Sequence, residues 1–180
     1  MRISDFGLRN EKSKIVSFVA AASNSGKTTL IEKIIPLLKA RGLRVAVVKH
    51  AHGGFEMDRP GKDSWRFREA GADAVMVVGP DELELTGSLK AEPLAEFELL
   101  VRDVDIVIQE GFKKTAKNKI EVFRAGISGG QPLCMTDPSF LALVSDAPFD
   151  TTIPRFDSND LCGITGYLIA TFIDPLRAGS

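Results

Sequence analysis

A glycine-containing loop between an apolar segment and an amphipathic one constrains the fold of this chain most. Residues 14–20 form a short run rich in β-branched side chains, which predicts a buried strand. Residues 21–28 read AASNSGKT and match the pattern G-x-x-x-x-G-K-[ST] except at the first position, where Ala21 replaces glycine. Apolar residues then recur at helical spacing over 30–38, predicting a helix of about four turns that Pro36 should kink and Gly42 should cap. Strand, loop and helix in this order predict a P-loop.

The loop has the chemistry of a site for nucleotide phosphates. Its backbone N–H groups and the N-terminus of the following helix attract anions. Lys27 is expected to reach the β- and γ-phosphates as a catalytic residue, and Thr28 to offer its hydroxyl to Mg²⁺. The other expected nucleotide-binding residues of the loop are Ser23, Asn24, Ser25, Gly26 and Thr29. The alternative, a chance Gly-Lys-Thr, is disfavoured because a strand pattern precedes the loop and a helix pattern follows it.

Strand and helix patterns alternate along the rest of the chain. Further strands are expected at 44–49, 74–78, 105–109, 119–123 and 140–144, and helices at 63–70, 93–101 and 159–172. This alternation predicts an α/β, three-layer P-loop NTPase fold with a mostly parallel sheet and helices on both faces. Segment 81–89 is expected to add a small β-hairpin. At 180 residues we expect a single domain, with loose ends at 1–13 and 174–180.

Two carboxylates are candidate Mg²⁺ ligands alongside Thr28. Glu110 follows the apolar run 106–108, a position from which P-loop enzymes hold the metal, and Gly111 permits close backbone approach. Asp58 lies in the polar, glycine-rich segment 49–64, which is longer than an ordinary connection. A loop that senses phosphate is expected there, so Asp58 is assigned to both the catalytic and the metal site. The alternative for each carboxylate is a solvated surface position.

Three more residues are candidates for contact with a nucleotide. Lys113 belongs to the dense basic stretch 112–119, which follows Glu110 and could clamp a phosphorylated ligand or form a solvated face. Ser145 and Asp146 end the last predicted strand, where an Asp carboxylate can accept both N–H groups of a guanine edge. The chain has no N-K-x-D signature, and strands often close with Ser or Asp to start a turn, so this alternative stays open.

Charge and composition exclude several classes of protein. The net charge of −1 and the pI near 6.1 give no global positive field, so neither nucleic acid nor a membrane surface is an expected partner. The apolar run 15–22 is far shorter than the roughly 20 residues of a membrane-spanning helix. Cys134 and Cys162 form no C-x-x-C pair, so we expect no disulfide scaffold and a cytoplasmic location.

Seven segments together resemble one known family. They are SGKTTL (25–30), IIPLL (34–38), RGLRV (41–45), VKHAH (48–52), MDRPGKDS (57–64), EAGA (69–72) and QEGFK (109–113). In this order they resemble molybdopterin-guanine dinucleotide biosynthesis protein B, and the likeness runs from about residue 14 to about residue 172. The stretch DRPGKDS is far more specific than the P-loop itself. The chain departs from the family at Ala21 and at Gly53–Gly54, where a further His is often found.

The resemblance implies a function and several residue roles. Proteins of this family are dimeric P-loop GTP-binding adapters with weak GTPase activity in molybdenum cofactor biosynthesis. They assist the guanylyltransferase that joins GMP to molybdopterin, and whether molybdopterin itself is bound stays open. By carry-over Lys27 and Thr28 bind phosphate and magnesium, and Asp58 and Glu110 complete the metal site. Ser145 and Asp146 gain weight as base contacts, so the expected cofactors are GTP and Mg²⁺.

Two other functions compete with this one. An ATP-dependent small-metabolite kinase or ligase related to dethiobiotin synthetase would use Lys49 and Lys113 to position an acceptor near the γ-phosphate. A metal-delivery GTPase would use His50 and His52, which no Cys or third His accompanies, so a solvated or substrate-facing role is favoured for both. The chain shows no obvious catalytic Gln. Arg59, Arg66 and Arg68 are candidates to act across a dimer.

Overall fold

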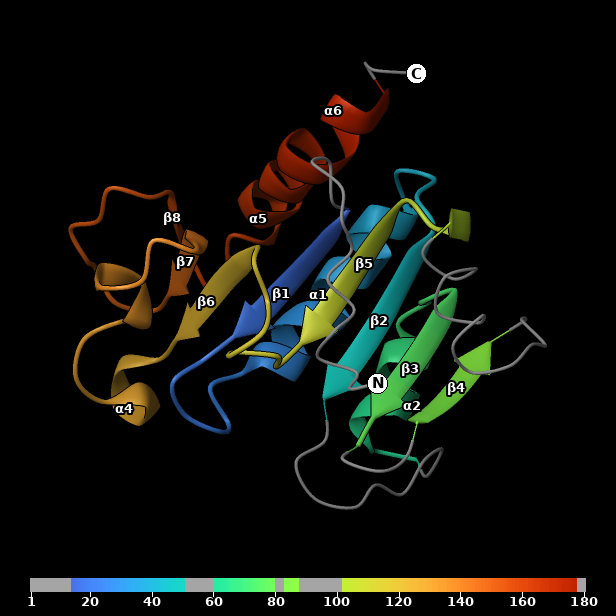
Figure 1. The fold of residues 1–180 in the computed structure, drawn as a ribbon, viewed down its shortest axis with the longest axis horizontal. Helices are drawn as coiled ribbons and strands as arrows, with labels where there is room; N and C mark the ends of the chain where they lie inside the picture. Colours follow the sequence, from blue (N-terminus) through green and yellow to red (C-terminus); the bar gives the residue numbers. More distant parts are fainter. Residues whose placement is uncertain (1–13, 51–59, 80–82, 88–101, 178–180) are drawn as a thin grey trace.

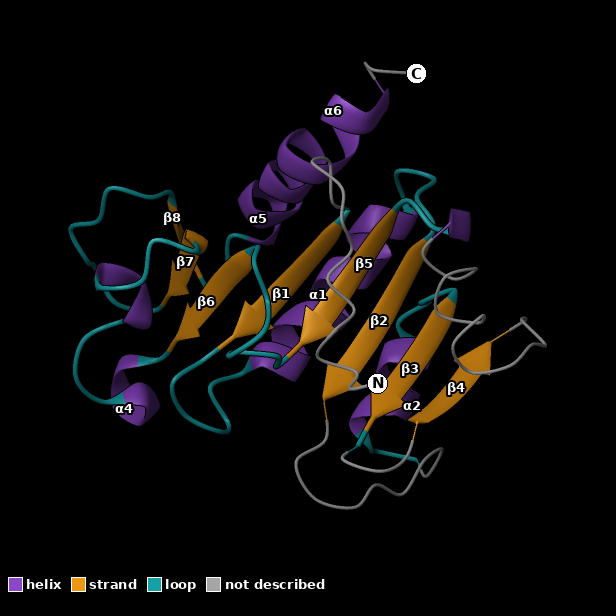
Figure 2. Ribbon diagram, in the orientation of Figure 1, coloured by secondary structure: helices purple, strands orange, loops and turns teal. Residues whose placement is uncertain are grey.

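The six apolar runs of the sequence form six strands of one sheet (Figures 1 and 2). The computed structural model describes residues 14–50, 60–79, 83–87 and 102–177. The strands are β1 (Ile15–Val19), β2 (Val45–His50), β3 (Ala74–Val78), β5 (Ile106–Glu110), β6 (Lys119–Phe123) and β7 (Phe140–Ser145). Each lies within one residue of its predicted bounds at either end. The prediction succeeds because these strands are buried on both sides and therefore apolar almost throughout.

The sheet has eight strands in the order β4-β3-β2-β5-β1-β6-β7-β8. All neighbours pair in parallel except β4 (Leu83–Gly87), which runs antiparallel to β3 at one edge. The hairpin expected in segment 81–89 is thus made by β4 together with β3. The strand β8 (Arg155–Asp157) at the other edge was not predicted, because it has only three residues and one apolar side chain. The α/β architecture with a mostly parallel sheet is confirmed.

The main described helices lie on one face of the sheet. Behind it in Figure 1 are α1 (Lys27–Lys39) and α2 (Asp63–Glu69), and α5 (Leu161–Leu168) packs against α1 in the same apolar core. Helix α1 continues through Pro36, whose carbonyl accepts from the Ala40 N–H at 2.9 Å. The helix predicted at 93–101, which would cover the other face, lies outside the described residues. Within the described chain, no helix is both long enough and apolar enough to span a membrane.

The C-terminal helix runs further than the sequence predicted. After α5 comes a π-helical stretch, Ile169–Ile173, and then α6 (Asp174–Arg177), so residues 174–177 are helical rather than a loose end. Phe172 and Ile173 are buried and hold this end of the helix against the core. Pro175 lies within this helical run, just after the π-helical stretch, and has no N–H to donate to the preceding turn. The helix continues past it to Arg177.

A short crossover connects the two strands that flank β1. Residues 111–118 pass from the end of β5 to the start of β6 without a helix. Asn118 fixes this segment on β1: its side-chain amide donates to the Ile15 carbonyl at 3.0 Å, and its own carbonyl accepts from Ser17 N–H at 2.8 Å. The basic stretch 112–119 therefore crosses beside the P-loop strand.

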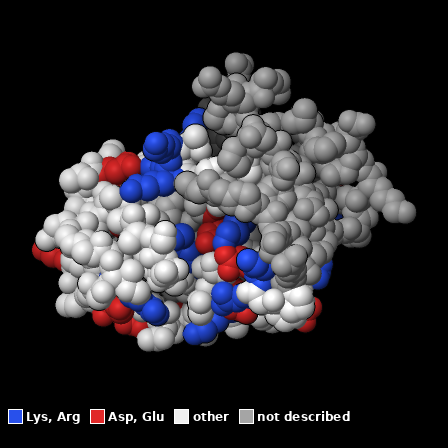
Figure 3. All heavy atoms as spheres, turned by 90° about the horizontal axis from the view of Figure 1, so that it is seen from below, with Lys and Arg blue, Asp and Glu red and all other residues white. Residues whose placement is uncertain are grey.

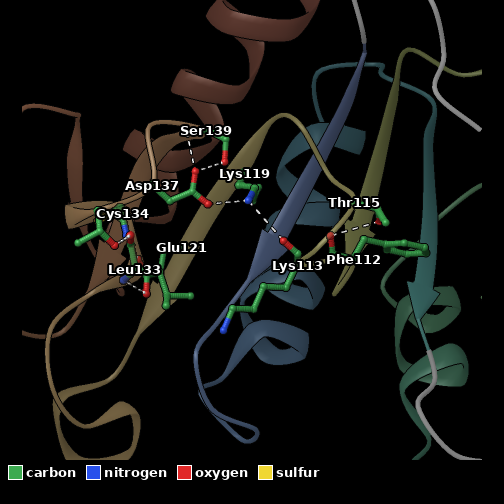
Figure 4. A network of polar contacts seen from close by, with 10 residues as sticks. Phe112, Lys113, Thr115, Lys119, Glu121, Leu133, Cys134, Asp137 and Ser139 are labelled. Carbon is green, nitrogen blue, oxygen red and sulfur yellow. Dashed lines mark hydrogen bonds and ion pairs between the residues drawn. The ribbon is translucent and has the colours of Figure 1, made fainter. Parts of the chain in front are cut away.

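Lys119, the last member of that stretch, is a structural residue. It is buried, and its ammonium pairs with Asp137 at 2.8 Å, donates to the Lys113 carbonyl at 3.3 Å and lies over the Phe140 ring (Figure 4). The hydrogen bond from Lys119, together with those from Ser139, holds the pKa of Asp137 well below its usual range. The Lys113 side chain is exposed and points away from this network. Of these two lysines, only Lys113 is open to a ligand.

Glu121 on the same strand is fully buried and organises the connection that follows. Its two carboxylate oxygens accept from the backbone N–H groups of Leu133 and Cys134 at 2.9 and 2.8 Å, at the start of the short 3₁₀ helix Leu133–Met135 (Figure 4). Burial and the neighbouring Glu121 carboxylate raise the pKa of the Cys134 thiol to about 12. The thiol therefore stays protonated at neutral pH. Together with α4 (Ala125–Ser128), this 3₁₀ helix forms the β6–β7 connection.

We expect the substitution Glu121→Gln to destabilise the fold. A glutamine keeps the size of the side chain but can accept only one of the two buried N–H groups, so the other loses its partner. The expected loss is about 1 to 3 kcal/mol in the free energy of unfolding, measured by urea titration. The exposed Glu69→Gln is the matched control and should change it by less than about 0.5 kcal/mol. Equal stability of both variants would contradict the role given to Glu121.

Candidate functional site

The parallel strands all end at one edge of the sheet, and the loop 20–26 lies there between the ends of β5 and β6. Strand β1 is the central strand that leads into the loop, with β5 on one side and β6 on the other. Figure 3 views the molecule from this edge and shows Lys and Arg side chains next to Asp and Glu side chains. In a sheet of this topology, ligands bind where the parallel strands end.

The loop has the backbone that a phosphate cradle needs. Gly26, directly before α1, has φ +86°, and Asn24 has φ +60°, the left-handed conformation that turns the chain into the helix. The buried Ser25 hydroxyl donates to the Ala22 carbonyl at 2.7 Å and closes the loop on itself. Ser23, Asn24 and Thr29 are exposed. Ala21 is not among the described residues with positive φ, so alanine replaces the usual glycine there without strain.

Two of the predicted metal ligands meet. The Thr28 hydroxyl donates to Oε1 of Glu110 at 2.9 Å, so the first turn of α1 is tied to the end of β5. Glu110 is buried, with only 7% of its surface exposed. A hydroxyl oxygen and a carboxylate oxygen at this distance are the hard ligands that Mg²⁺ prefers, and such an ion keeps several waters and uses substrate phosphates for the rest. The residues present therefore fit a Mg²⁺–nucleotide complex.

Positive charge is concentrated around this carboxylate. Partial burial lowers the pKa of the Lys27 ammonium, and the charge of Glu110 opposes the shift. Burial likewise lowers the pKa of Lys49, again opposed by Glu110, whose Oε2 lies 3.5 Å from the Lys49 ammonium. Lys49 also pairs closely with Asp63, in the first turn of α2. Two partly buried ammonium groups, those of Lys27 and Lys49, thus lie near one buried carboxylate.

A second set of contacts joins α2 to α1. The Arg66 guanidinium pairs with Glu32 at 2.5 Å, donates to the Thr29 hydroxyl at 3.3 Å and lies 3.6 Å from Asp63. Arg66, one of the arginines considered for action across a dimer, is therefore engaged within its own chain. Asp63 was not singled out from the sequence, although its position three residues before Arg66 on a helix is a recognisable signal.

Only part of the histidine-containing segment 49–64 lies among the described residues. Asp58, Arg59 and His52 lie outside the described residues. His50 ends β2, and its ring lies 5.1 Å from that of Phe112 between centroids. Gly111 makes this contact possible: its φ is +96°, and a Cβ there would come within 3.2 Å of the His50 Cβ. In the described chain, no three His, Cys, Asp or Glu side chains gather as a metal cluster.

The two residues predicted to contact the base already accept hydrogen bonds from backbone N–H groups of the protein. Ser145 is fully buried, and its hydroxyl accepts from the Ala147 N–H at 3.0 Å. Asp146 accepts from the Ala125 N–H at 2.9 Å, which fixes the start of α4. Both residues stand at the same edge of the sheet as the P-loop, but with these contacts the structure gives them turn-forming roles.

Comparison with known proteins is consistent across sequence and structure. Residues 15–146 match the family model described as molybdopterin guanine dinucleotide synthesis protein B. The chain is 36% identical over 160 residues to the molybdopterin-guanine dinucleotide biosynthesis adapter protein of Escherichia coli, covering 83% of this chain and 89% of the relative. A crystal structure of molybdopterin-guanine biosynthesis protein B is similar with a TM-score of 0.52 and 31% identity, over 87% of this chain and 97% of that one.

A more distant neighbour shows the fold alone. The structure of HypB from Helicobacter pylori, solved in complex with nickel, has a TM-score of 0.56 with 16% sequence identity. It covers 89% of this chain and 87% of that chain. The fold is thus common to proteins that have diverged widely in sequence.

The ion pair of Lys49 with Glu110 should be measurable as a coupling energy. Lys49→Met and Glu110→Gln should each destabilise the protein, and the double variant should lose less than the sum of the two. We expect a coupling of about 1 to 2 kcal/mol, because both groups are largely withdrawn from solvent. The more exposed pair Lys39–Asp73, tested as Lys39→Met and Asp73→Asn, is the control and should couple by less than about 1 kcal/mol. If the effects of the single substitutions at Lys49 and Glu110 simply add, the ion pair between them is refuted.

Proposed function

The chain belongs to the molybdopterin guanine dinucleotide synthesis protein B family, and from this premise we propose that it is a Mg²⁺-dependent GTP-binding adapter with weak GTPase activity. Family membership gives it a place in molybdopterin-guanine dinucleotide biosynthesis. The nucleotide, the metal ion and the partner enzyme are our proposals. The observation that carries the nucleotide and the metal ion is the contact between Thr28 and Glu110 beside Lys27 at the end of β1.

Each residue of this group has a defined task in nucleotide binding. The N–H groups at the start of α1 and the Lys27 ammonium would hold the phosphate chain, and Lys27 would stabilise charge that develops on the γ-phosphate. Thr28 and Glu110, with Asp58 as a further proposed ligand, would hold Mg²⁺ directly or through water. A Mg²⁺ ion held there would neutralise part of the phosphate charge. Lys49 limits repulsion between Glu110 and the incoming phosphates.

Slow hydrolysis is proposed because the site offers little to activate a water. Gln109 directly precedes Glu110, but its amide oxygen accepts a hydrogen bond from the Ser17 hydroxyl at 2.6 Å, so it is held within the sheet. Arg66 is paired with Glu32, so its guanidinium is engaged away from any nucleotide phosphate bound by the same chain. In related chemistry a positioned Gln and an arginine finger supply most of the acceleration. A nucleotide-dependent binding role fits this site better than rapid turnover.

The partner proposed for this adapter is the guanylyltransferase that joins GMP to molybdopterin. Support comes from the name of the Escherichia coli relative, an adapter in molybdopterin-guanine dinucleotide biosynthesis. We further propose a homodimer in the cytoplasm, with the exposed Lys113 as a secondary nucleotide contact and with Ser145 and Asp146 acting through the turns that they hold. Direct binding of molybdopterin is part of the same proposal and would be decided by titration with that ligand.

The metabolite-kinase alternative is less well supported. It requires Lys49 as a cation that positions an acceptor, and this ammonium is already paired with Asp63 and Glu110. The metal-delivery alternative rests on His50 and His52, of which only His50 is described, and the likeness to HypB extends to the fold alone. Nucleotide preference separates the adapter from the kinase directly.

Calorimetric titration with GTP and with ATP, each with and without Mg²⁺, tests the proposed function. We expect GTP to bind at least about tenfold more tightly than ATP, a difference of about 1.4 kcal/mol. Lys27→Ala should weaken GTP binding by about 100-fold or more, because a charge-assisted contact to phosphate is lost. The exposed Lys117→Ala should bind like the wild type. Tighter binding of ATP would transfer the protein to the kinase class, and unchanged affinity of Lys27→Ala would refute the P-loop assignment.

The substitution Thr28→Val should remove the response to metal. Valine has nearly the shape of threonine but no hydroxyl, so one magnesium ligand is lost while the loop keeps its backbone. We expect the gain in GTP affinity on adding Mg²⁺ to fall by about tenfold or more, with little change in affinity when Mg²⁺ is absent. Thr29→Val, one position further along α1, should keep the full response. A normal Mg²⁺ response in Thr28→Val would exclude Thr28 from the metal site.

A further inference from the structure

A pocket opens on the side of the P-loop away from the metal residues. Thr28 and Lys27 face Glu110 on β5, whereas the pocket is bounded by Gly26, Thr29 and Lys33 of α1 and its approach, and by the end of β6. Its remaining wall is the turn after β8, with Ser158 and Asn159. A ligand bound across the loop therefore meets two different environments, one on each side.

Arg124 is the charged group of β6 that reaches this pocket. Its guanidinium carbon lies 3.7 Å from the position a Cβ would take on Gly26, so the group lies beside the last residue of the loop before α1. Its backbone N–H donates to the Ser128 hydroxyl at 3.0 Å, which anchors the residue at the start of α4. The side chain itself is 49% exposed. The backbone is fixed while the guanidinium stays accessible from the pocket.

The guanidinium keeps most of its donors for a ligand. Among the described residues, its ion-pair partner is Asp146, and the two groups are 4.0 Å apart, at the limit of an ion pair. Asp146 is meanwhile committed to the Ala125 N–H at 2.9 Å. Arginine presents five N–H donors in a planar fork suited to phosphate oxygens. An anion placed beside Gly26 would bind this group better than Asp146 does.

The rest of the pocket suits a nucleoside. Leu30, Val122 and Phe123 give it an apolar floor, and Phe123 is held rigid by an edge-to-face contact with Phe149 at 4.9 Å between centroids. The Ser158 hydroxyl and the Asn159 amide supply both donors and acceptors. The Asn159 N–H donates to the Asp157 carboxylate at 2.8 Å, which fixes this turn. An apolar surface with a few placed polar groups is the usual composition of such a site.

We infer that Arg124 binds the phosphate nearest the nucleoside, and that the pocket beside it, with a volume of about 50 Å³, takes part of the nucleoside. This inference rests on the proposed function, because it assigns the second half of the same nucleotide. The P-loop then works from both sides: Lys27, Thr28 and Glu110 hold the terminal phosphates and the metal, and Arg124 holds the α-phosphate. Asn159, and not Asp146, is the side chain placed to contact the base.

Substitutions on the Arg124 side of the P-loop should affect nucleotide binding differently from substitutions on the metal side. Because GDP and GTP share the α-phosphate and the nucleoside, Arg124→Ala should weaken both by the same factor, about tenfold, and leave the response to Mg²⁺ unchanged. Arg124→Lys should recover part of the loss by restoring the charge without the planar fork. Asn159→Ala should weaken GTP and leave the affinity for inorganic triphosphate unchanged, because that ligand lacks a nucleoside.

Titration of these variants with GTP, GDP and inorganic triphosphate tests the roles proposed for Arg124 and for the pocket. Arg155→Ala, an exposed arginine on β8, is the matched control and should bind like the wild type. If the wild-type protein binds GTP and Arg124→Ala binds both nucleotides within twofold of it, the role of Arg124 is refuted. If Asn159→Ala loses inorganic triphosphate as strongly as GTP, the nucleoside assignment of the pocket is refuted. Failure of the wild-type protein to bind GTP would instead overturn the proposed function itself.

Discussion

The buried Glu110 carboxylate connects the parts of the molecule on which the site depends. One oxygen accepts from Thr28 on α1, and the other faces Lys49 on β2, which in turn pairs with Asp63 on α2. Three elements distant in sequence are thereby fixed around the end of β5. A carboxylate this deeply buried requires such partners, because an uncompensated charge would be costly at this position. The same arrangement suits the metal ion and the polyphosphate proposed for this site.

The sequence was sufficient for the central sheet and for the pairing of Thr28 with Glu110. Both follow from local patterns: apolar runs mark buried strands, and the P-loop spacing places Thr28 in the first turn of a helix. The end of β5 then lies beside the loop, because β5 pairs in parallel with β1, the strand that leads into the loop. The strand β8 and the extension to α6 were not found, since three residues with one apolar side chain, and a proline after Asp174, carry no clear pattern.

Side-chain roles on β6 could not be read from the sequence, because they depend on partners far away in the chain. Lys119 appeared to belong to a basic surface stretch, but Asp137 and the Phe140 ring bury it. Glu121 belongs to no recognisable motif, yet it binds two backbone N–H groups more than ten positions later. Alternation of charged and apolar residues indicates a half-exposed strand only when nothing covers the polar face. Here the β6–β7 connection covers it.

The same limit applies to Ser145 and Asp146, and it points to where base recognition has to come from. Their position at a strand end is right for a base contact, but position alone does not leave a side chain free: one is fully buried and the other binds the Ala125 N–H. By holding the start of α4, Asp146 fixes the backbone next to Arg124. Its contribution to the nucleotide site is then indirect, through the placement of the guanidinium beside Gly26. To read guanine, the Asp146 carboxylate would have to share its acceptor sites with the Ala125 N–H, whereas the Asn159 amide is exposed at the pocket and shares no such bond among the described residues.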